Sequence, residues 1–320
     1  MVARIAIIGA GISGLAAARR LHDAGHDCLV LEKSRGLGGR MATRHTDGLS
    51  FDHGAQYFTA RGTDFRHQVH AWQDQCAVAA WGTDRYVGRP DMTAPAGALA
   101  APLEVRRNSR VERLRRSDGA WHLQVESTPE HAGLEGPFDA VLLALPAPQA
   151  AELSATAATG FAALAGVRYA PCIALMAAVE GSTDLHETSC ELSGQPLSWV
   201  ARNATKPGRD AETETLVAHA GPDWSREHIQ QDPDQLAHPL LTALRPLLGS
   251  ARLLHHQVHR WLYARVEQAA GRPCLWDAGQ RLGACGDWAL GPRVEAAFDS
   301  GRALADAVLE TLPDPRTGGS

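Results

Sequence analysis

The chain has 320 residues, with 31 lysines and arginines against 36 aspartates and glutamates and a net charge of -5. This length favours two domains, and the scattered charge excludes the basic surface that nucleic acids or a polybasic membrane contact require. No apolar stretch is long enough to span a membrane, and the first apolar run, residues 5–8, leads into glycines instead of a signal-peptide cleavage site. We therefore expect a cytoplasmic protein whose partner is a small molecule, with its oligomeric state left open.

The first thirty residues alternate between strand and helix patterns. Residues 4–8 are a short apolar run, residues 13–24 have amphipathic helical periodicity and end at Gly25, and residues 27–31 form a second apolar run. This order predicts a βαβ unit, the opening of a dinucleotide-binding domain of Rossmann type.

The middle of the chain predicts further strands. Residues 86–103 are rich in Pro, Gly and Ala and are expected to be a connection, whereas residues 104–114 and 121–126 alternate around the turn at 117–119 and predict a hairpin. Residues 140–145 are wholly apolar and are followed by a proline, which is typical of a parallel strand buried on both faces.

The second half has longer strand patterns, which predict an antiparallel sheet with one helix near residues 234–247. Its expected strands are 173–179, 197–202, 215–220 and 257–265. A short strand at 282–285 and a helix at 293–311 are expected to return to the first domain, before a disordered tail at 315–320.

Six cysteines are spread along the chain without a CxxC pair, so neither a zinc site nor a disulfide framework is indicated. His255, His256 and His259 lie close together, but no carboxylate is spaced to complete a ligand set, and their segment has a strand pattern. We predict no metal.

A glycine-rich motif, GAGISG, occupies residues 9–14, between the first predicted strand and helix. Its glycines permit a tight turn and close approach of a pyrophosphate to the helix N-terminus. Glu32 ends the second strand, where a carboxylate accepts hydrogen bonds from ribose hydroxyls. Together these features predict a dinucleotide site; the alternative is a glycine turn with a structural role only.

A second glycine-rich turn, RGLGGR at residues 35–40, follows Glu32 at once, which NAD-only Rossmann domains seldom have. Arg40 offers a guanidinium to a pyrophosphate, so the pair of turns favours FAD; a solvated basic turn is the alternative. The residues predicted to hold the adenosine pyrophosphate half are Gly9, Gly11, Ile12, Ser13, Gly14, Glu32, Lys33, Gly39, Arg40 and Val111.

Near the other end, Gly286 and Asp287 follow a strand and precede the helix that begins near Arg293. Asp287 is placed to accept a hydrogen bond from a ribityl hydroxyl, and the helix N-terminus places positive charge beside the flavin pyrimidine edge. A Gly-Asp pair in an ordinary turn is the alternative. The residues predicted for the riboflavin half are Gln56, Pro146, Gly286, Asp287, Arg293 and Val294.

With these motifs, the chain resembles the amine-oxidase-like flavoproteins and, among them, the bacterial renalases. The resemblance rests on segments 5–21, 32–44, 52–61 (DHGAQYFTAR), 145–150, 199–210 (WVARNATKPGRD), 259–265 (HRWLYAR) and 285–288 (CGDW). Two departures are a short span between Trp81 and Tyr86 and Asp91 in place of an expected glycine.

The resemblance implies a Rossmann-type FAD-binding domain and a smaller α+β substrate domain with an antiparallel sheet, in the topology of p-hydroxybenzoate hydroxylase and the amine oxidases. It also implies noncovalent FAD and oxidation of 2- or 6-dihydro-NAD(P) to NAD(P)+, with electrons passed to molecular oxygen and hydrogen peroxide as by-product. The expected division is 1–65, 96–150 and 272–314 for the FAD-binding domain and 66–95 and 151–271 for the substrate domain.

Hydride transfer to a flavin needs positioning more than acid or base help, so flat aromatic walls and a few polar anchors are expected. The predicted catalytic residues are Tyr57, Phe58, Trp199, Arg202, Asn203, His219 and Trp288, with Trp261 and Tyr263 as further aromatic candidates and Lys206 and Arg209 as added charge. For the aromatic residues the alternative is packing in the core, and for the basic residues it is a solvated loop. For His219 and Gln56 the alternative is a buried side chain with a structural role.

Two other functions stay open: oxidation of small amines, and a flavin-bound interaction protein without turnover. An amine site favours an aromatic cage with little charge, so the basic run 202–209 favours the dinucleotide substrate. The preference for the 2- or 6-isomer, or for NAD or NADP, is not indicated.

Overall fold

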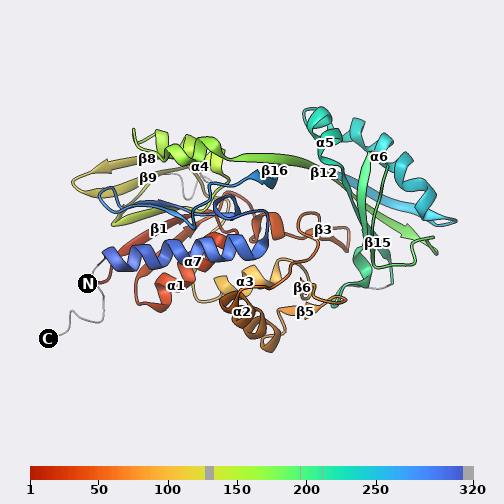
Figure 1. Cartoon of the computed structure of the whole chain (residues 1–320), viewed down its shortest axis with the longest axis horizontal. Helices are drawn as coiled ribbons and strands as arrows, with labels where there is room; N and C mark the ends of the chain where they lie inside the picture. The colour runs from red at the N-terminus through yellow and green to blue at the C-terminus, as the bar shows by residue number, and fades with distance from the viewer. Residues whose placement is uncertain (127–132, 195, 211, 313–320) are drawn as a thin grey trace.

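The structure, a computed structural model, describes residues 1–126, 133–194, 196–210 and 212–312. The expected tail at 315–320 lies outside the described residues. Within them, every helix is too short or too polar to cross a bilayer. Figure 1 shows two lobes side by side, with both chain ends on the left-hand lobe.

A mixed sheet forms the centre of the left-hand lobe. Its order is β17 (Leu275–Asp277), β18 (Leu282–Ala284), β11 (Ala140–Leu143), β1 (Arg4–Ile8), β2 (Asp27–Leu31) and β7 (Glu104–Arg106). All neighbouring pairs are parallel except β17 with β18. The predicted Rossmann-type sheet is therefore confirmed, including the bounds of β1 and β2.

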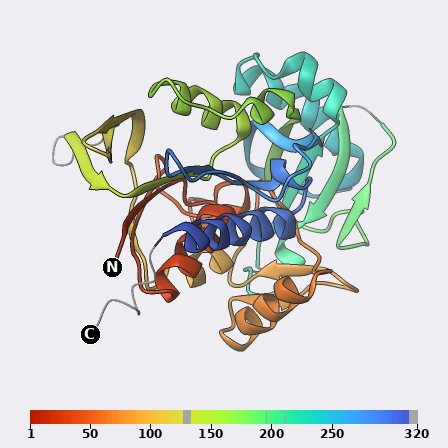
Figure 2. The same ribbon diagram turned by 60° about the vertical axis from the view of Figure 1, so that its left-hand side comes forward.

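The central strands of this sheet are buried on both faces, as the apolar runs predicted. Ile5 and Ile7 of β1 pack in a core with α1 (Ile12–Asp23) and α7 (Val294–Thr311). Ala6 and Ile8 pack in a core with β8 (Arg110–Ser117) and β9 (Ala120–Glu126). Helices α1 and α7 lie side by side in both views (Figures 1 and 2). A Cβ added at Gly301 of α7 would lie 2.1 Å from the Ser13 carbonyl oxygen, which explains why α7 carries a glycine there.

A smaller sheet covers the other face, in the order β10 (Gly133–Phe138), β9 (Ala120–Glu126) and β8 (Arg110–Ser117), with α4 (Ala147–Ala155) beside it. The hairpin β8–β9 is confirmed, but the expected single strand over residues 104–114 is wrong. Asn108 has φ 53°, so the chain turns there and β7 joins the Rossmann-type sheet while β8 begins the hairpin.

The right-hand lobe is an antiparallel sheet in the order β13 (Ser189–Glu191), β14 (Leu197–Arg202), β15 (Glu214–Ala220), β12 (Arg168–Glu180) and β16 (Arg252–Gln268). Helix α6 (Pro233–Leu248) packs its Leu236, Leu240 and Leu244 against it, and α5 (Pro222–His228) lies next to α6. The predicted antiparallel sheet and helix are confirmed. Strands β12 and β16 are longer than expected and reach back to the left-hand lobe (Figure 1).

The segment between residues 63 and 100 holds α2 (Thr63–Asp74), the hairpin β5 (Val78–Ala80) and β6 (Tyr86–Gly88), and α3 (Ala94–Ala100). The expectation of a plain connection at 86–103 is therefore wrong. Phe65 and Trp72 of α2 pack against Phe298 of α7, so this segment shares a core with the Rossmann-type sheet. The domain boundaries given above stay a prediction.

The remaining elements are short. They are the hairpin β3 (Arg44–Thr46) and β4 (Leu49–Phe51), and four 3-10 turns at Gly39–Met41, Ala162–Gly166, Asn203–Thr205 and Asp287–Ala289 within the described ranges.

Candidate active site

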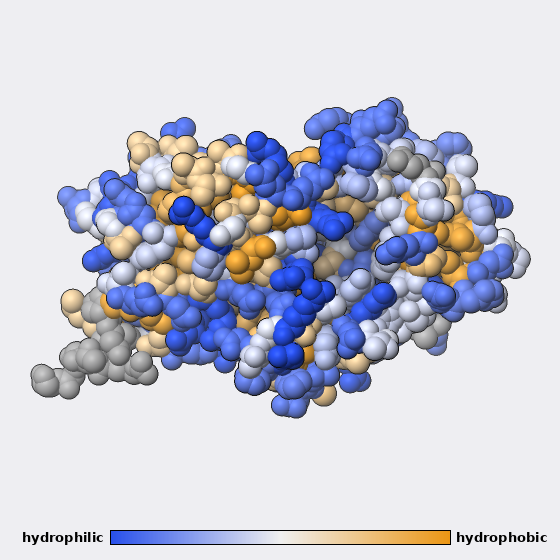
Figure 3. All heavy atoms as spheres, in the orientation of Figure 1, coloured by the Kyte–Doolittle hydropathy of each residue, from blue (hydrophilic) through white to orange (hydrophobic). Residues whose placement is uncertain are grey.

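A long cavity of 2170 Å³ runs between the two lobes. It begins at Glu32 and Val111, passes Arg40 and Asp287, and ends at Trp199 and His219. On the face drawn in Figure 3 the molecule is hollowed between the lobes, and hydrophilic residues gather around the hollow. Ordinary small-molecule pockets have roughly 300–1,000 Å³, so this cavity has room for a dinucleotide and a second ligand.

The glycine motif forms the turn that the sequence predicts, and each glycine has a different reason to be one. Gly9 has φ 106°, and a Cβ at Gly14 would lie 2.1 Å from the Gly9 carbonyl oxygen, so both are needed by the turn itself. A Cβ at Gly11 would meet nothing within 4 Å and would enter the cavity. The lack of a side chain at Gly11 therefore lets a ligand in the cavity approach the backbone closely.

Glu32 holds the turn in place from the end of β2. Its carboxylate accepts hydrogen bonds from the Ala10 amide at 2.9 Å and from the Ser34 amide at 2.8 Å. The second glycine turn lies beside the first, because the Gly38 amide donates to the Ala10 carbonyl at 2.9 Å. The bare edge at Gly11, the carboxylate and the N-terminus of α1 meet in one corner, which fits the adenosine pyrophosphate half of FAD.

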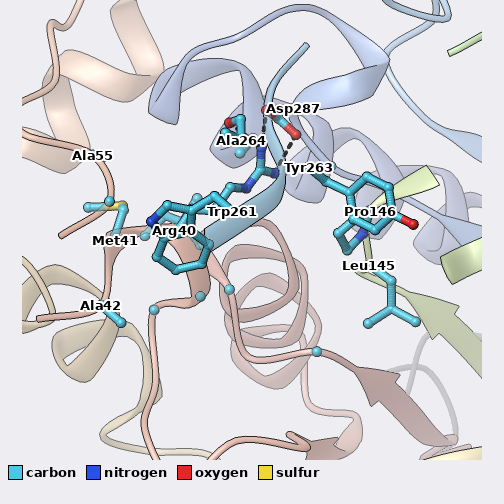
Figure 4. Close-up of a pocket in the computed structure, with 18 of the residues that line it drawn as sticks. Arg40, Met41, Ala42, Ala55, Leu145, Pro146, Trp261, Tyr263, Ala264 and Asp287 are labelled. Atoms are coloured by element: carbon cyan, nitrogen blue, oxygen red, sulfur yellow. Dashed lines mark hydrogen bonds and ion pairs between the residues drawn. The ribbon is translucent and has the colours of Figure 1, made fainter. Parts of the chain in front are cut away.

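Arg40 and Asp287 form a bidentate ion pair in the middle of the cavity (Figure 4), with nitrogen–oxygen distances of 2.8 and 2.6 Å. Arg40 also donates to the Ala264 carbonyl of β16 at 3.2 Å. Burial opposes the charge of Arg40, but Asp287 raises the pKa of the guanidinium above its ordinary value. The Arg40 guanidinium therefore stays charged, and the bidentate pair fixes Asp287 where a ribityl chain would pass.

The far end of the cavity is aromatic. Trp199 of β14 and His219 of β15 are cross-strand neighbours with ring centroids 5.6 Å apart, and Trp261 of β16 lies 5.0 Å from the ring of His53. Tyr263 continues this wall toward Pro146 (Figure 4). These flat faces suit the rings of a flavin and of a planar substrate.

Most of the predicted residues line this one cavity. They are Gly9, Gly11, Ile12, Ser13, Glu32, Lys33, Gly39, Arg40, Tyr57, Phe58, Val111, Pro146, Trp199, His219, Gly286, Asp287, Arg293 and Val294. Phe58 is mostly a core residue, because it is buried and stacks on Tyr86 with the centroids 6.0 Å apart.

Trp288 does not line the cavity, which corrects the expectation of a catalytic role. The side chain is fully buried in the core and its indole nitrogen donates to the Leu145 carbonyl at 3.0 Å. A Cβ at Gly286 would lie 2.5 Å from that nitrogen. Trp288 therefore supports the turn that presents Asp287.

The expected substrate contacts of Arg202, Asn203, Lys206 and Arg209 are also corrected, since none of them lines the cavity. Arg202 is paired with Glu214 at 2.6 Å. Asn203 is buried, donates to the Ser50 carbonyl at 3.0 Å and accepts from the Asp52 amide at 3.3 Å. Their polar groups are used inside the protein.

Lys206 and Arg209 meet at a single carboxylate, that of Asp52, at 2.9 and 2.6 Å, and all three side chains are buried. Gln56 lies next to this cluster and accepts a hydrogen bond from Lys206 at 3.0 Å. The cluster joins the 52–58 loop to the antiparallel sheet directly behind the cavity wall.

Some cavity residues were missed from the sequence. His53, Arg44 and Arg260 line the wall although none was singled out as a contact, and His259 was weighed only as a metal ligand. The strand pattern of β16 could have drawn attention to His259, Trp261 and Tyr263, which all line the cavity. His255 and His259 lie on that strand at a separation of about 13 Å, too far apart to share a metal ion.

Comparison with known proteins places this geometry in a family. Residues 7–72 match an NAD(P)-binding Rossmann-like domain, and residues 65–309, more than half of the chain, match the flavin containing amine oxidoreductases. The chain belongs to that family. The flavoprotein takes FAD as its cofactor, in agreement with the fit of the cavity.

Solved structures show the same fold at low identity. A putative protoporphyrinogen oxidase from Exiguobacterium sp. 255-15 superimposes with a TM-score of 0.73 at 13% identity, over 97% of this flavoprotein and 99% of that chain. A triple mutant of a putrescine oxidase superimposes with a TM-score of 0.68 at 12% identity, over 96% and 99%.

One match to a curated sequence covers a short segment. The 4,4'-diapophytoene desaturase of Staphylococcus aureus (strain Newman) is 49% identical over 80 residues, which are 22% of this flavoprotein and 16% of the desaturase. The match thus spans about a sixth of that enzyme's length and carries no argument about its substrate.

Proposed function

We propose that this flavoprotein oxidises 2- or 6-dihydro-NAD(P) to NAD(P)+, as the resemblance to bacterial renalases implies. Bound FAD would accept the hydride and pass its two electrons to molecular oxygen. The balance is one dihydropyridine, one oxygen molecule and one proton giving NAD(P)+ and hydrogen peroxide. The reaction is assigned to the cytoplasm, and FAD is proposed to be held noncovalently.

The observation that carries this proposal is the charge of the substrate end of the cavity. The described cavity-lining residues within 42–61, 170–172, 198–222 and 259–266 include no carboxylate but do include Arg44, Arg61 and Arg265. Arg260 also lines the cavity, but its guanidinium donates to the Ile229 and Gln231 carbonyls. The carboxylates that line the cavity lie toward the adenosine end or have partners: Asp287 pairs with Arg40 and Glu267 with Arg226. A basic wall favours an anionic substrate and disfavours an ammonium ion.

The chain's own residues supply positioning. Trp199 and His219 offer flat rings to a dihydropyridine, and the Arg40–Asp287 pair orients the ribityl side, so no protein nucleophile is needed. Cys285 is buried behind this region and burial raises the pKa of its thiol to about 12. A thiol held neutral in this way supports noncovalent binding.

A second candidate is an oxidase of small amines, favoured by membership in the flavin containing amine oxidoreductases. The basic run 202–209 does not disfavour an amine substrate, because its charges are paired with Glu214 and Asp52 inside the protein. The two candidates differ in the sign of the substrate charge, which the wall arginines test.

We expect rapid bleaching of the flavin when the FAD-loaded protein is mixed anaerobically with 6-dihydroNAD or 2-dihydroNAD, and slow or no bleaching with NADH or with a panel of amines. Stopped-flow absorbance measures the rate. Fast reduction by an amine alone would establish the second candidate, and no reduction by any compound would favour a flavin-bound protein without turnover.

Arg44→Met is expected to raise KM for dihydro-NAD by roughly 10- to 100-fold, the worth of a charge-assisted hydrogen bond of about 1.5–3 kcal/mol. The rate of flavin reduction at saturation should change little, since Arg44 contacts no reacting atom. Arg19→Met is the control, because Arg19 is half-buried on α1 away from the cavity and, among the described residues, has its ion pair with Asp23. An unchanged KM in Arg44→Met would remove the basic wall as support for the proposal.

A further inference from the structure

A continuous line of hydrogen bonds leads from the buried Asp52 cluster to the cavity wall. The Lys206 ammonium donates to Asp52 Oδ2 at 2.9 Å and to Gln56 Oε1 at 3.0 Å. The Gln56 amide nitrogen donates to the Asp52 and Gly54 carbonyls and lies 3.4 Å from Nε2 of His219. Lys206 and Gln56 do not line the cavity, whereas His219 does.

The direction of each bond in this line follows from the donor at its buried end. An ammonium group only donates, so the Gln56 atom beside Lys206 must be the carbonyl oxygen, and this fixes the orientation of the amide. The amide nitrogen, also only a donor, then faces His219. Both of its hydrogens are donated to the Asp52 and Gly54 carbonyls, and an amide nitrogen cannot accept an N–H from Nε2. The geometry therefore favours a bare Nε2, which puts the ring proton on Nδ1.

The same line acts against a charged His219. Protonated Nε2 would place an N–H against the Gln56 amide nitrogen, and Lys206 lies beyond it as a buried cation. Burial and the Lys206 charge lower the pKa of His219 to about 4, against a hydrogen bond to the His53 backbone that raises it. Trp199 is uncharged, and Asp52 is already shared by Lys206 and Arg209.

We propose that Lys206 and Gln56 are positioning residues that hold His219 as a neutral Nδ1–H imidazole, so that it serves with Trp199 as an aromatic wall for the substrate ring and exchanges no proton. The tautomer stands on the hydrogen bonds alone, whereas the role of the wall rests on the proposed function. Nε2 faces the Gln56 amide inside the protein, and the ring lies beside that of Trp199 in the cavity wall.

The first test measures the tautomer directly in the FAD-loaded protein. Imidazole 15N NMR of His219 is expected to report a protonated Nδ1 and a bare Nε2 from pH 5.5 to 8. In Lys206→Met, where Asp52 keeps Arg209 as its partner, Gln56 is free to rotate and the Nε2–H form should appear. A wild-type Nε2–H tautomer, or titration of His219 near pH 6.5, would overturn the proposal whether or not any substrate is oxidised.

The second test separates a wall from a base. His219→Phe keeps a flat neutral ring and is expected to retain the rate of flavin reduction by dihydro-NAD within about tenfold, with an unchanged pH profile, because loss of a general base costs roughly 10²–10⁴. His219→Ala should instead raise KM. The role of His219 as an aromatic wall would be overturned if His219→Phe lost roughly 10²-fold or more in the rate of flavin reduction while His219→Ala reacted no more slowly. If no dihydropyridine reduces the flavin, the NMR measurement alone decides the tautomer and the proposed function fails separately.

Discussion

Gly11→Val is expected to give a folded protein that binds FAD roughly 100-fold more weakly than the wild type. Position 11 has φ -74° and ψ 174°, which valine adopts readily, and a Cβ there meets no protein atom within 4 Å. The added methyl groups enter the cavity at the corner where the pyrophosphate must approach the N-terminus of α1. Overpacking of up to about 3 kcal/mol corresponds to roughly a 100-fold loss of FAD affinity.

The measurement is a titration of the apo-protein with FAD, followed by protein fluorescence, with the apo Tm recorded beside it. Gly97→Ala is the matched control, because a Cβ at Gly97 also meets nothing within 4 Å but lies on α3, away from the cavity. Gly14→Ala should differ from both and fail to fold, since its Cβ would lie 2.1 Å from the Gly9 carbonyl. A yellow Gly11→Val protein with native affinity would contradict the assigned pyrophosphate position.

Asp52→Asn is expected to lower the free energy of unfolding by roughly 3–5 kcal/mol, the cost of breaking a buried ion pair from one side. Asp52 is fully buried and neutralises two buried cations, Lys206 and Arg209. Its removal leaves both without a counter-charge. Burial lowers the pKa of Lys206 to about 8 even with Asp52 present, so the variant should recover part of its stability as pH rises and Lys206 loses its proton.

The wild-type protein also loses stability as pH falls, but at lower pH and through Asp52. Burial alone would raise the pKa of Asp52, but Lys206, Arg209 and the Thr43 hydroxyl hold it well below its ordinary value. The folded state therefore gains stability from Asp52 above about pH 3.9, and this gain is lost as pH falls below that value. Urea unfolding between about pH 2 and 9 tests both slopes. Asp23→Asn, an exposed partner of Arg19, is the control and should change stability by less than about 1 kcal/mol.

The parts of the site that the sequence predicts well are those set by neighbouring residues. The turn at Gly9–Gly14, the carboxylate of Glu32 and the Gly286–Asp287 pair each follow a strand directly, so local pattern fixes their place. The fold class follows in the same way, because the buried apolar runs and the alternating strands differ in period.

The parts that the sequence could not predict depend on distant partners. Lys206 and Arg209 have the composition of a solvated loop, yet they are buried because Asp52, about 150 residues earlier, lies opposite them. Trp288 is next to a cofactor residue in the chain but turns into the core. The local hydrophobic periodicity does not show whether these side chains are buried or exposed. Their partners come together only when the two lobes pack against each other.

Strands β12 and β16 stay paired from one lobe into the other, along a ladder of roughly 40 Å at about 3.3 Å per residue. Both contribute to the cavity wall on the way. Swinging one lobe against the other would have to bend or break this ladder, so the pairing resists a large closing motion. Selection between ligands then depends on the shape and charge of the cavity more than on closure.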